Sequence, residues 1–123
     1  MLEVPKDDLI RNTAPLKKGV ETINKSLYKL ALVADDSGVL EGVISDGDVR
    51  RALLAGVRLT DPVSQVMNHA PISVRLGTSD AEARDLMLNK SIFSLPVLDG
   101  GCVVGVKTLV KQELATIDNL VFI

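Results

Sequence analysis

The residues best suited to chemistry are concentrated in one short stretch, residues 42–51, which reads GVISDGDVRR. A carboxylate such as that of Asp48 accepts two charge-assisted hydrogen bonds from a vicinal diol, as in a ribose. If a helix begins here, the hydroxyl of Ser45 and the free backbone N–H groups can receive a phosphate, helped by the helix dipole. Gly47 lets a ligand approach the backbone closely. The stretch is therefore a candidate site for a small anionic ligand.

The same residues also have a purely structural interpretation. Ser45 and Asp48 are three positions apart, which is close to a capping box with Asp in place of Glu. Acids such as Asp46 in a first turn are stabilised by the helix dipole without any ligand. Arg50 and Arg51 can either reach a phosphate or pair with these acids. On the residues alone, a ligand site and a simple helix start both stay open.

The chain has one histidine, His69, and one cysteine, Cys102. They lie in different segments, so we predict neither a thiol–histidine catalytic pair nor a zinc site. Cys102 falls in the apolar run CVVGV and is expected to be a small buried residue. His69 is interpreted either as a surface or capping residue or as one that stacks or hydrogen-bonds near a cleft. No metal or resident cofactor is predicted.

The composition indicates a globular chain without the features of nucleic-acid-binding or membrane proteins. Of the 123 residues, 46% are hydrophobic but only 2% are aromatic, so the core must consist of Val, Ile, Leu and Ala. The 14 basic and 16 acidic residues are mixed along the chain without a basic stripe, which argues against nucleic acid as a partner. No apolar run approaches the ~20 residues that span a bilayer, and the N-terminus lacks a signal pattern. We therefore expect a cytoplasmic protein.

Two parts of the chain resemble each other, residues 23–51 and residues 88–112. Each runs from Asn-Lys-Ser through an apolar strand, an Asp/Gly turn and a second apolar strand to a polar or hydroxyl residue that opens a helix. Gly42 in the first copy aligns with Gly105 in the second. The copies differ in length within the turn, as expected of a true repeat.

The apolar runs predict two β-hairpins. Residues 30–35 and 39–45 form the first, and residues 95–99 and 102–106 form the second, each closed by Asp and Gly residues. Continuous apolar strands are covered on both faces, so helices must pack on them.

The helical periodicity and the capping residues predict four helices, over residues 15–24, 46–56, 79–90 and 107–115. The third opens with Ser-Asp-Ala-Glu, a capping-box pattern. The apolar segment between the repeats is expected to form one short helix near residues 63–67.

We divide the chain into a first repeat, 1–60, a second repeat, 61–116, and a remainder, 117–123. A unit of ~50 residues is marginal as an independent fold, so each repeat is expected to bury its sheet against the other. The predicted fold class is α/β (α+β). Two repeats, each a short sheet packed with two helices, are related by a pseudo-twofold axis, with clefts where they meet.

This arrangement resembles a tandem cystathionine-β-synthase (CBS) domain pair, or Bateman module. Residues 42–48 match its pattern Gly-apolar-x-Ser/Thr-x-x-Asp in full, and residues 105–111 match it until Lys111 replaces the acid. The resemblance implies a non-catalytic regulatory module that binds an adenine nucleotide (AMP, ADP or ATP) between the repeats. It also implies that the motif Asp holds the ribose, that the Ser/Thr helps to place phosphate, and that the base packs near the strand preceding a repeat's first helix.

The second copy of the motif is expected to form an altered cleft. Thr108 is interpreted as a helix N-cap that can also contact a ligand. Lys111 cannot accept hydrogen bonds from a ribose diol, although it can attract a phosphate. Lys107, at the strand end beside it, is expected to be an exposed charge.

Two other classes of function compete with ligand sensing. The first is a purely structural module without a small-molecule ligand, which dimerises through its helices. The second is a small enzyme, which is disfavoured because the chain lacks a Ser–His–Asp set and a glycine-rich phosphate loop. Whether the chain senses a ligand or is a purely structural module, we expect a flat twofold homodimer that pairs through residues 49–56 and 108–115.

The last segment, residues 117–123, reads IDNLVFI and predicts the first strand of a following domain, or else a tail packed on the dimer. The join resembles a branch of sugar-nucleotide pyrophosphorylases (nucleotidyltransferases), in which a CBS pair precedes the catalytic domain. Residues 45–51, SDGDVRR, resemble that branch too, and similar stretches occur with sugar-phosphate isomerases. An attached C-terminal enzyme domain is therefore expected.

Overall fold

The first of two three-stranded sheets is formed by the N-terminal half. A computed structural model describes residues 1–5 and 8–109 of the chain. Strands β1 (Leu9–Ile10), β2 (Ala31–Ala34) and β3 (Leu40–Ile44) lie in the order β1-β2-β3. β1 is parallel to β2, and β2 and β3 form the predicted antiparallel hairpin.

The second sheet repeats this topology. It contains β4 (Val74–Arg75), β5 (Ser94–Asp99) and β6 (Cys102–Thr108) in the order β4-β5-β6, again with one parallel and one antiparallel pair. An irregularity in register follows Val33 in the first hairpin and Val97 in the second. The internal repeat predicted from the sequence is therefore confirmed at the level of individual strands.

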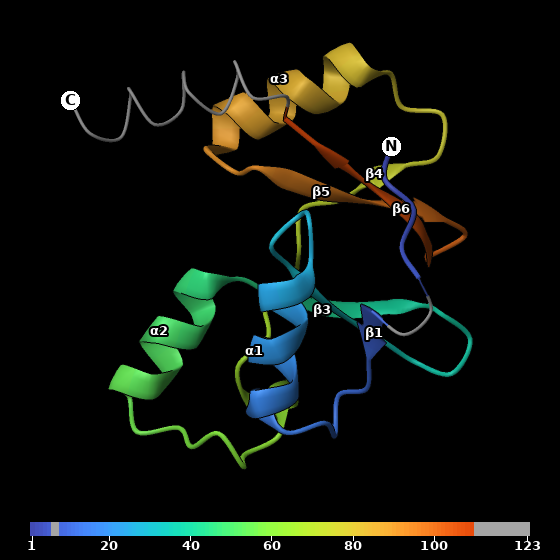
Figure 1. Cartoon of the computed structure of the whole chain (residues 1–123). Helices are drawn as coiled ribbons and strands as arrows, with labels where there is room; N and C mark the ends of the chain where they lie inside the picture. Colours follow the sequence, from blue (N-terminus) through green and yellow to red (C-terminus); the bar gives the residue numbers. More distant parts are fainter. Residues whose placement is uncertain (6–7, 110–123) are drawn as a thin grey trace, which may run out of the picture.

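Three of the four predicted helices lie among the described residues. They are α1 (Leu16–Lys25), α2 (Asp46–Leu54) and α3 (Asp80–Lys90), and the expected short helix is the 3-10 helix η2 (Val63–Gln65). The halves lie one above the other, with α1 and α2 beside one sheet and α3 over the other (Figure 1). The fourth prediction is wrong at its start, because β6 continues to Thr108. The rest of that helix and the segment 117–123 lie outside the described residues.

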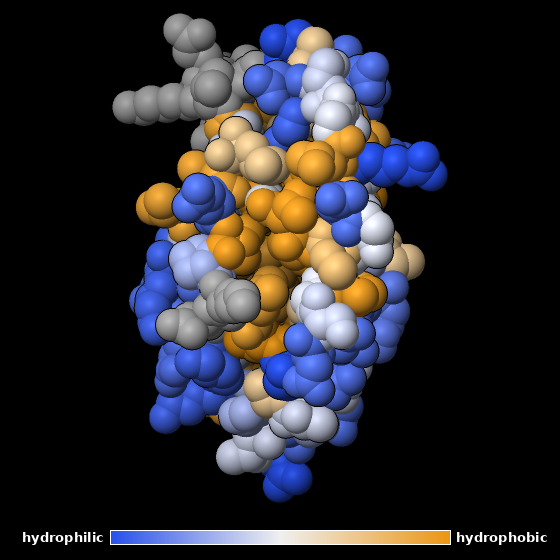
Figure 2. Space-filling model, turned by 90° about the vertical axis from the view of Figure 1, so that its right-hand side faces the viewer, coloured by the Kyte–Doolittle hydropathy of each residue, from blue (hydrophilic) through white to orange (hydrophobic). Residues whose placement is uncertain are grey.

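Apolar clusters fill each half and the layer between them. One cluster joins α1 to the first sheet, a second joins α3 to the second sheet, and a third lies between the halves. The third cluster has buried members Tyr28, Leu32 and Val106, with only partly buried residues around them. Figure 2 shows apolar side chains gathered along the middle of one face. The halves therefore meet through an apolar layer, as the size of each repeat requires.

One strand in each half also forms backbone hydrogen bonds with a segment from the other half of the chain. Leu2 pairs with Val106 of β6, with N···O distances of 2.7 and 2.9 Å. Asn68, in the connecting segment, pairs in the same way with Val43 of β3, at 2.8 and 3.2 Å. The N-terminus accordingly lies beside β6 in Figure 1. The division of the repeats at residues 60 and 61 stays a prediction.

The glycines of the two motifs allow these segments to approach. A Cβ added to Gly42 would lie 2.8 Å from the carbonyl oxygen of Asn68, and one added to Gly105 would lie 2.9 Å from that of Leu2. Cβ atoms do not tolerate such distances. The repeated glycine is thus explained by a close backbone crossing.

The turns of the two hairpins are joined by backbone hydrogen bonds. The Leu40 N–H donates to the Gly101 carbonyl and the Val103 N–H donates to the Gly38 carbonyl, each at 3.0 Å. Cys102 lies at this junction, with its sulfur 3.5 Å from the Ser37 carbonyl oxygen, and it is only partly buried. Among the described residues, no helix has the length and apolar character to cross a membrane.

Candidate functional site

The start of α2 is the reciprocal capping box suggested by the sequence. The backbone N–H of Asp48 donates to Ser45 Oγ at 3.3 Å. In return, the backbone N–H and the hydroxyl of Ser45 donate to Asp48 Oδ2 at 2.9 and 3.1 Å. Asp46 adds a second, exposed acid to the first turn. These contacts position the motif without any ligand.

Arg51 folds back onto this turn. Its Nη2 lies 2.8 Å from Asp48 Oδ1. A Cβ built on Gly47 would lie 3.2 Å from Arg51 Nη1, so the guanidinium covers this glycine. Both carboxylate oxygens of Asp48 therefore already accept hydrogen bonds. The Arg51 side chain is 73% exposed, so it can leave Asp48 at little cost.

A cavity of about 490 Å³ opens beside the motif and is lined by both repeats. From the first repeat come the start of α2 and the turn after α1. From the second come the segment after α3, the start of β5, and Ile72. Most of its walls are apolar. Its lining residues are Tyr28, Lys29, Leu30, Val43, Ser45, Asp46, Gly47, Asp48, Asn68, Ile72, Ser91, Ile92, Phe93, Ser94 and Pro96.

Two residues with an unusual backbone lie in this wall. Lys29 (φ 56°) and Ser91 (φ 53°) are the non-glycine residues with positive φ among residues 1–5 and 8–109. They follow α1 and α3: Ser91 ends the second copy of Asn-Lys-Ser, whereas Lys29 lies three residues after the end of the first copy. Left-handed backbone at residues other than glycine is uncommon and often accompanies a functional site.

A buried polar contact joins the two repeats at the floor of the cleft. The Ser94 hydroxyl donates to the Tyr28 carbonyl at 2.9 Å. The Tyr28 hydroxyl lies 3.3 Å from Asp8 Oδ2. Burial, and secondarily the nearby Asp8 carboxylate, raises the pKa of Tyr28 to about 12.

The structure brings four of the nine predicted site residues into the cavity wall: Ser45, Asp46, Gly47 and Asp48. Arg50 and His69 are exposed and do not line it, although Asn68 beside His69 does. Arg51 reaches the site through Asp48. Thr108 ends β6 away from this cavity, and Lys111 lies outside the described residues.

Sequence reasoning missed most of the opposite wall. The signal that could have found it is the repeated Asn-Lys-Ser with an aromatic residue two positions later, NKSLY and NKSIF, which marks the beginning of both repeats. Phe93 of the second copy lines the cavity and is still 46% exposed. An exposed aromatic ring beside a capped helix start is suited to a ligand with a flat apolar part.

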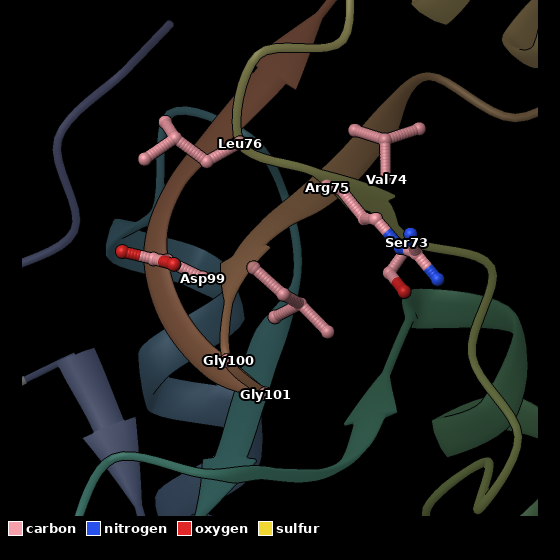
Figure 3. A pocket seen from close by; sticks show the side chains of 8 residues that line it. Ser73, Val74, Arg75, Leu76, Asp99, Gly100 and Gly101 are labelled. Carbon is pink, nitrogen blue, oxygen red and sulfur yellow. The ribbon is translucent and has the colours of Figure 1, made fainter.

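Two other cavities are less suited to a ligand. One of about 470 Å³ lies at the edge of the second sheet, where the side chains of Arg75 and Asp99 point away from each other (Figure 3). The other lies at the matching edge of the first sheet, where Arg11 is already paired with Asp36. In the described part of the chain, no group of three or more His, Cys, Asp or Glu residues is placed to hold a metal ion.

Comparison with known proteins agrees with this geometry. The CBS domain family matches residues 5–55 and 63–106. Arabinose 5-phosphate isomerase KdsD of Escherichia coli K12 is 32% identical over 98 residues, which cover 79% of this chain and 30% of the isomerase. Arabinose 5-phosphate isomerase GutQ of Salmonella typhi is 37% identical over 70 residues, 57% of this chain and 22% of the isomerase. The chain thus spans less than a third of these relatives, which are isomerases and not nucleotidyltransferases.

Solved structures share the fold. CBSX2 in complex with AMP has a TM-score of 0.71 and 22% identity, covering 98% of this chain and 94% of CBSX2. The acetoin utilization protein AcuB from Vibrio cholerae has a TM-score of 0.78 and 23% identity, covering 98% and 88%. The cytosolic domain of the Mg²⁺ channel MgtE in complex with ATP has a TM-score of 0.70 and 24% identity, covering 94% and 46%.

Proposed function

Because this chain belongs to the CBS domain family, we propose that it is a non-catalytic regulatory module that binds an adenine nucleotide in the cleft between its repeats. One observation carries the proposal. The capped motif of the first repeat and an apolar wall from the second repeat line the same cavity of about 490 Å³. This volume lies within the range typical of small-molecule sites.

The residues of the cleft have complementary roles toward such a ligand. The ribose hydroxyls donate to the Asp48 carboxylate, and the phosphate lies at the start of α2, where the helix dipole favours an anion. The base packs on the apolar wall that includes Ile72 and Phe93. Two of the structural neighbours were solved in complex with AMP and with ATP, which supports an adenine nucleotide as the class to test.

The hydrogen bonds of Asp48 imply a rearrangement on binding. Oδ2 already accepts two hydrogen bonds from Ser45, and Oδ1 accepts one from Arg51. An oxygen of a carboxylate has about two acceptor positions. Three of the about four positions on Asp48 are thus occupied, whereas the two hydroxyls of a ribose need two. A ribose diol therefore displaces Arg51 from Asp48, and the freed guanidinium can pair with the phosphate.

A nucleotide panel tests the proposal. With AMP, ADP or ATP at about 100 times its Kd, the free energy of unfolding rises by about 2.7 kcal/mol, which a thermal melt detects as a higher Tm. Asp48→Ala should weaken binding roughly 10- to 150-fold, because it removes charge-assisted hydrogen bonds. Asp99→Ala, which removes an exposed carboxylate outside the cleft, is the matched control.

One result would contradict this function, and another would contradict the role of Asp48 in it. If no nucleotide raises the Tm, the alternative of a structural dimerisation module is favoured. If nucleotide binds but Asp48→Ala binds it as well as the parent does, the ribose role is wrong and the motif only starts a helix.

For the attached enzyme we infer a sugar-phosphate isomerase. The curated relatives support this choice, whereas the pyrophosphorylase alternative rests on the resemblance of segment 117–123 and of residues 45–51. Reading the gene on both sides of the chain tests the inference. A neighbouring nucleotidyltransferase domain would contradict it and leave the nucleotide proposal intact.

A further inference from the structure

The two repeats present different side chains at one matching place. Asn68 pairs with Val43, the residue after the motif glycine Gly42. Leu2 pairs with Val106, the residue after the other motif glycine, Gly105. Asn68 and Leu2 therefore occupy equivalent positions under the pseudo-twofold relation, and the first offers an amide where the second offers only hydrocarbon.

Asn68 is an exposed residue that local hydrogen bonds hold at the cleft. Both of its backbone groups are bonded to Val43, and its Oδ1 accepts a hydrogen bond from the Ala70 N–H at 3.0 Å. The donor at Ala70 requires an acceptor, so this contact fixes which end of the amide is the oxygen. The Nδ2 group has no protein partner among residues 1–5 and 8–109, and Asn68 lines the cavity.

We propose, on the premise of the proposed function, that Asn68 is a specificity-determining residue of the first cleft, whose Nδ2 donates a hydrogen bond to an acceptor on the bound nucleoside. Adenine ring nitrogens and ribose oxygens are acceptors of this kind. An unpartnered donor beside apolar walls favours ligands that present an acceptor to it. Because Leu2 offers no donor at the matching place, the second cleft binds the same nucleotide more weakly than the first.

Two substitutions separate this role from a turn-forming one. Asn68→Asp keeps an oxygen that accepts from Ala70 but removes the donor and adds a negative charge. Asn68→Leu removes the donor without adding a charge and introduces the residue found at the equivalent position. Calorimetric titration with AMP should show both variants weakened about 3- to 10-fold, as expected for one lost hydrogen bond. In the parent, the first cleft should bind AMP more tightly than any second site.

The controls make each outcome decisive. Asn89→Asp adds the same charge at an exposed asparagine of α3 that does not line the cleft, and it should bind like the parent. Parent-like binding by Asn68→Asp would mean that Asn68 only forms the turn, and parent-like binding by Asn68→Leu would mean that only the added charge matters. Either result overturns the specificity role, and two sites of equal affinity per chain would overturn the expected difference between the clefts. A parent that binds no AMP would instead overturn the proposed function itself.

Discussion

Lys107 of β6 and Asp80, the first residue of α3, form an ion pair with 2.9 Å between Nζ and Oδ1. The same ammonium group also donates to the Thr78 carbonyl. The Lys107 side chain is only 13% exposed, so the expectation of a free strand-end charge is wrong. Lys107 instead fastens the end of the second sheet to the beginning of its helix.

The first prediction concerns stability at low pH. The hydrogen bond and charge of Lys107 lower the pKa of Asp80 below its usual value. The stabilisation is therefore present above the unfolded-state pKa of about 3.9 and is lost as the pH falls through the lower folded-state pKa. Urea unfolding should show Asp80→Asn to be less stable than the parent at pH 7, with the difference disappearing in acid. A difference that persists at low pH would contradict the ion pair's role.

A second prediction concerns high pH. Because the pKa of Tyr28 is raised to about 12, the folded protein retains this proton where the unfolded chain, with a pKa near 10, loses it. Stability therefore falls as the pH rises from about 10 to 12, by about 2–3 kcal/mol. Tyr28 is the sole tyrosine of the sequence, so its ultraviolet absorbance reports the titration directly. Tyr28→Phe should lack this part of the pH dependence, and a native midpoint near 10 would refute the shift.

A third prediction compares two helix caps. Ser45→Ala should cost about 1–2 kcal/mol of stability, because Ser45 both accepts from and donates to Asp48. Ser79→Ala should cost less, since Ser79 only accepts from the Glu82 N–H. Equal losses in urea unfolding would show that the reciprocal bonds add nothing.

A fourth prediction tests the close backbone crossing. Gly42→Ala should destabilise the fold by about 1–3 kcal/mol, because the new methyl group would overlap the Asn68 carbonyl. Gly19→Ala on α1 is the control. Its methyl group would meet Val63 at 3.4 Å, and helix propensity gains up to about 1 kcal/mol. Similar chemical denaturation midpoints for the two variants would contradict the account of Gly42.

A fifth prediction concerns assembly. Leu53 and Leu54 on α2 are 47% and 83% exposed, and we expect them to pair with a second copy in a twofold homodimer. Sedimentation should give a dimer for the parent and a monomer for Leu54→Glu. A parent that sediments only as a monomer, with and without nucleotide, would exclude this interface. The other expected contact, residues 108–115, lies largely outside the described residues.

The features predicted correctly from the sequence are local ones. The hairpins are marked by apolar runs and Asp/Gly turns, and the cap of α2 involves residues three positions apart. The two-residue strands β1 and β4 were not predicted individually, because they exist only through pairing with β2 and β5. Tertiary context sets such short strands, whose own pattern is too brief to read.

The site was predicted on one side only for a related reason. The motif from Ser45 to Asp48 is contiguous, whereas the opposite wall comes from turns far away in the sequence. Glycine is the residue type that indicates a left-handed backbone, and lysine and serine are not. The residue types of Lys29 and Ser91 therefore do not indicate the positive φ that they adopt in the cleft wall. Likewise, nothing near Lys107 in the sequence indicates that Asp80 is its partner.

The backbone pairing of Leu2 with Val106 has a consequence for the order of folding. The pairing of Leu2 with Val106 closes almost the whole described chain into a loop, whereas each hairpin joins neighbouring strands. Long loops cost more conformational entropy to close, so this pairing forms after the hairpins. The N-terminal segment therefore joins β6 only after the hairpins exist, so this link between the halves is completed late in folding. Pulsed hydrogen exchange during refolding should show the amides of Leu2 and Val106 protected after those of β2 and β3, and simultaneous protection would exclude this order.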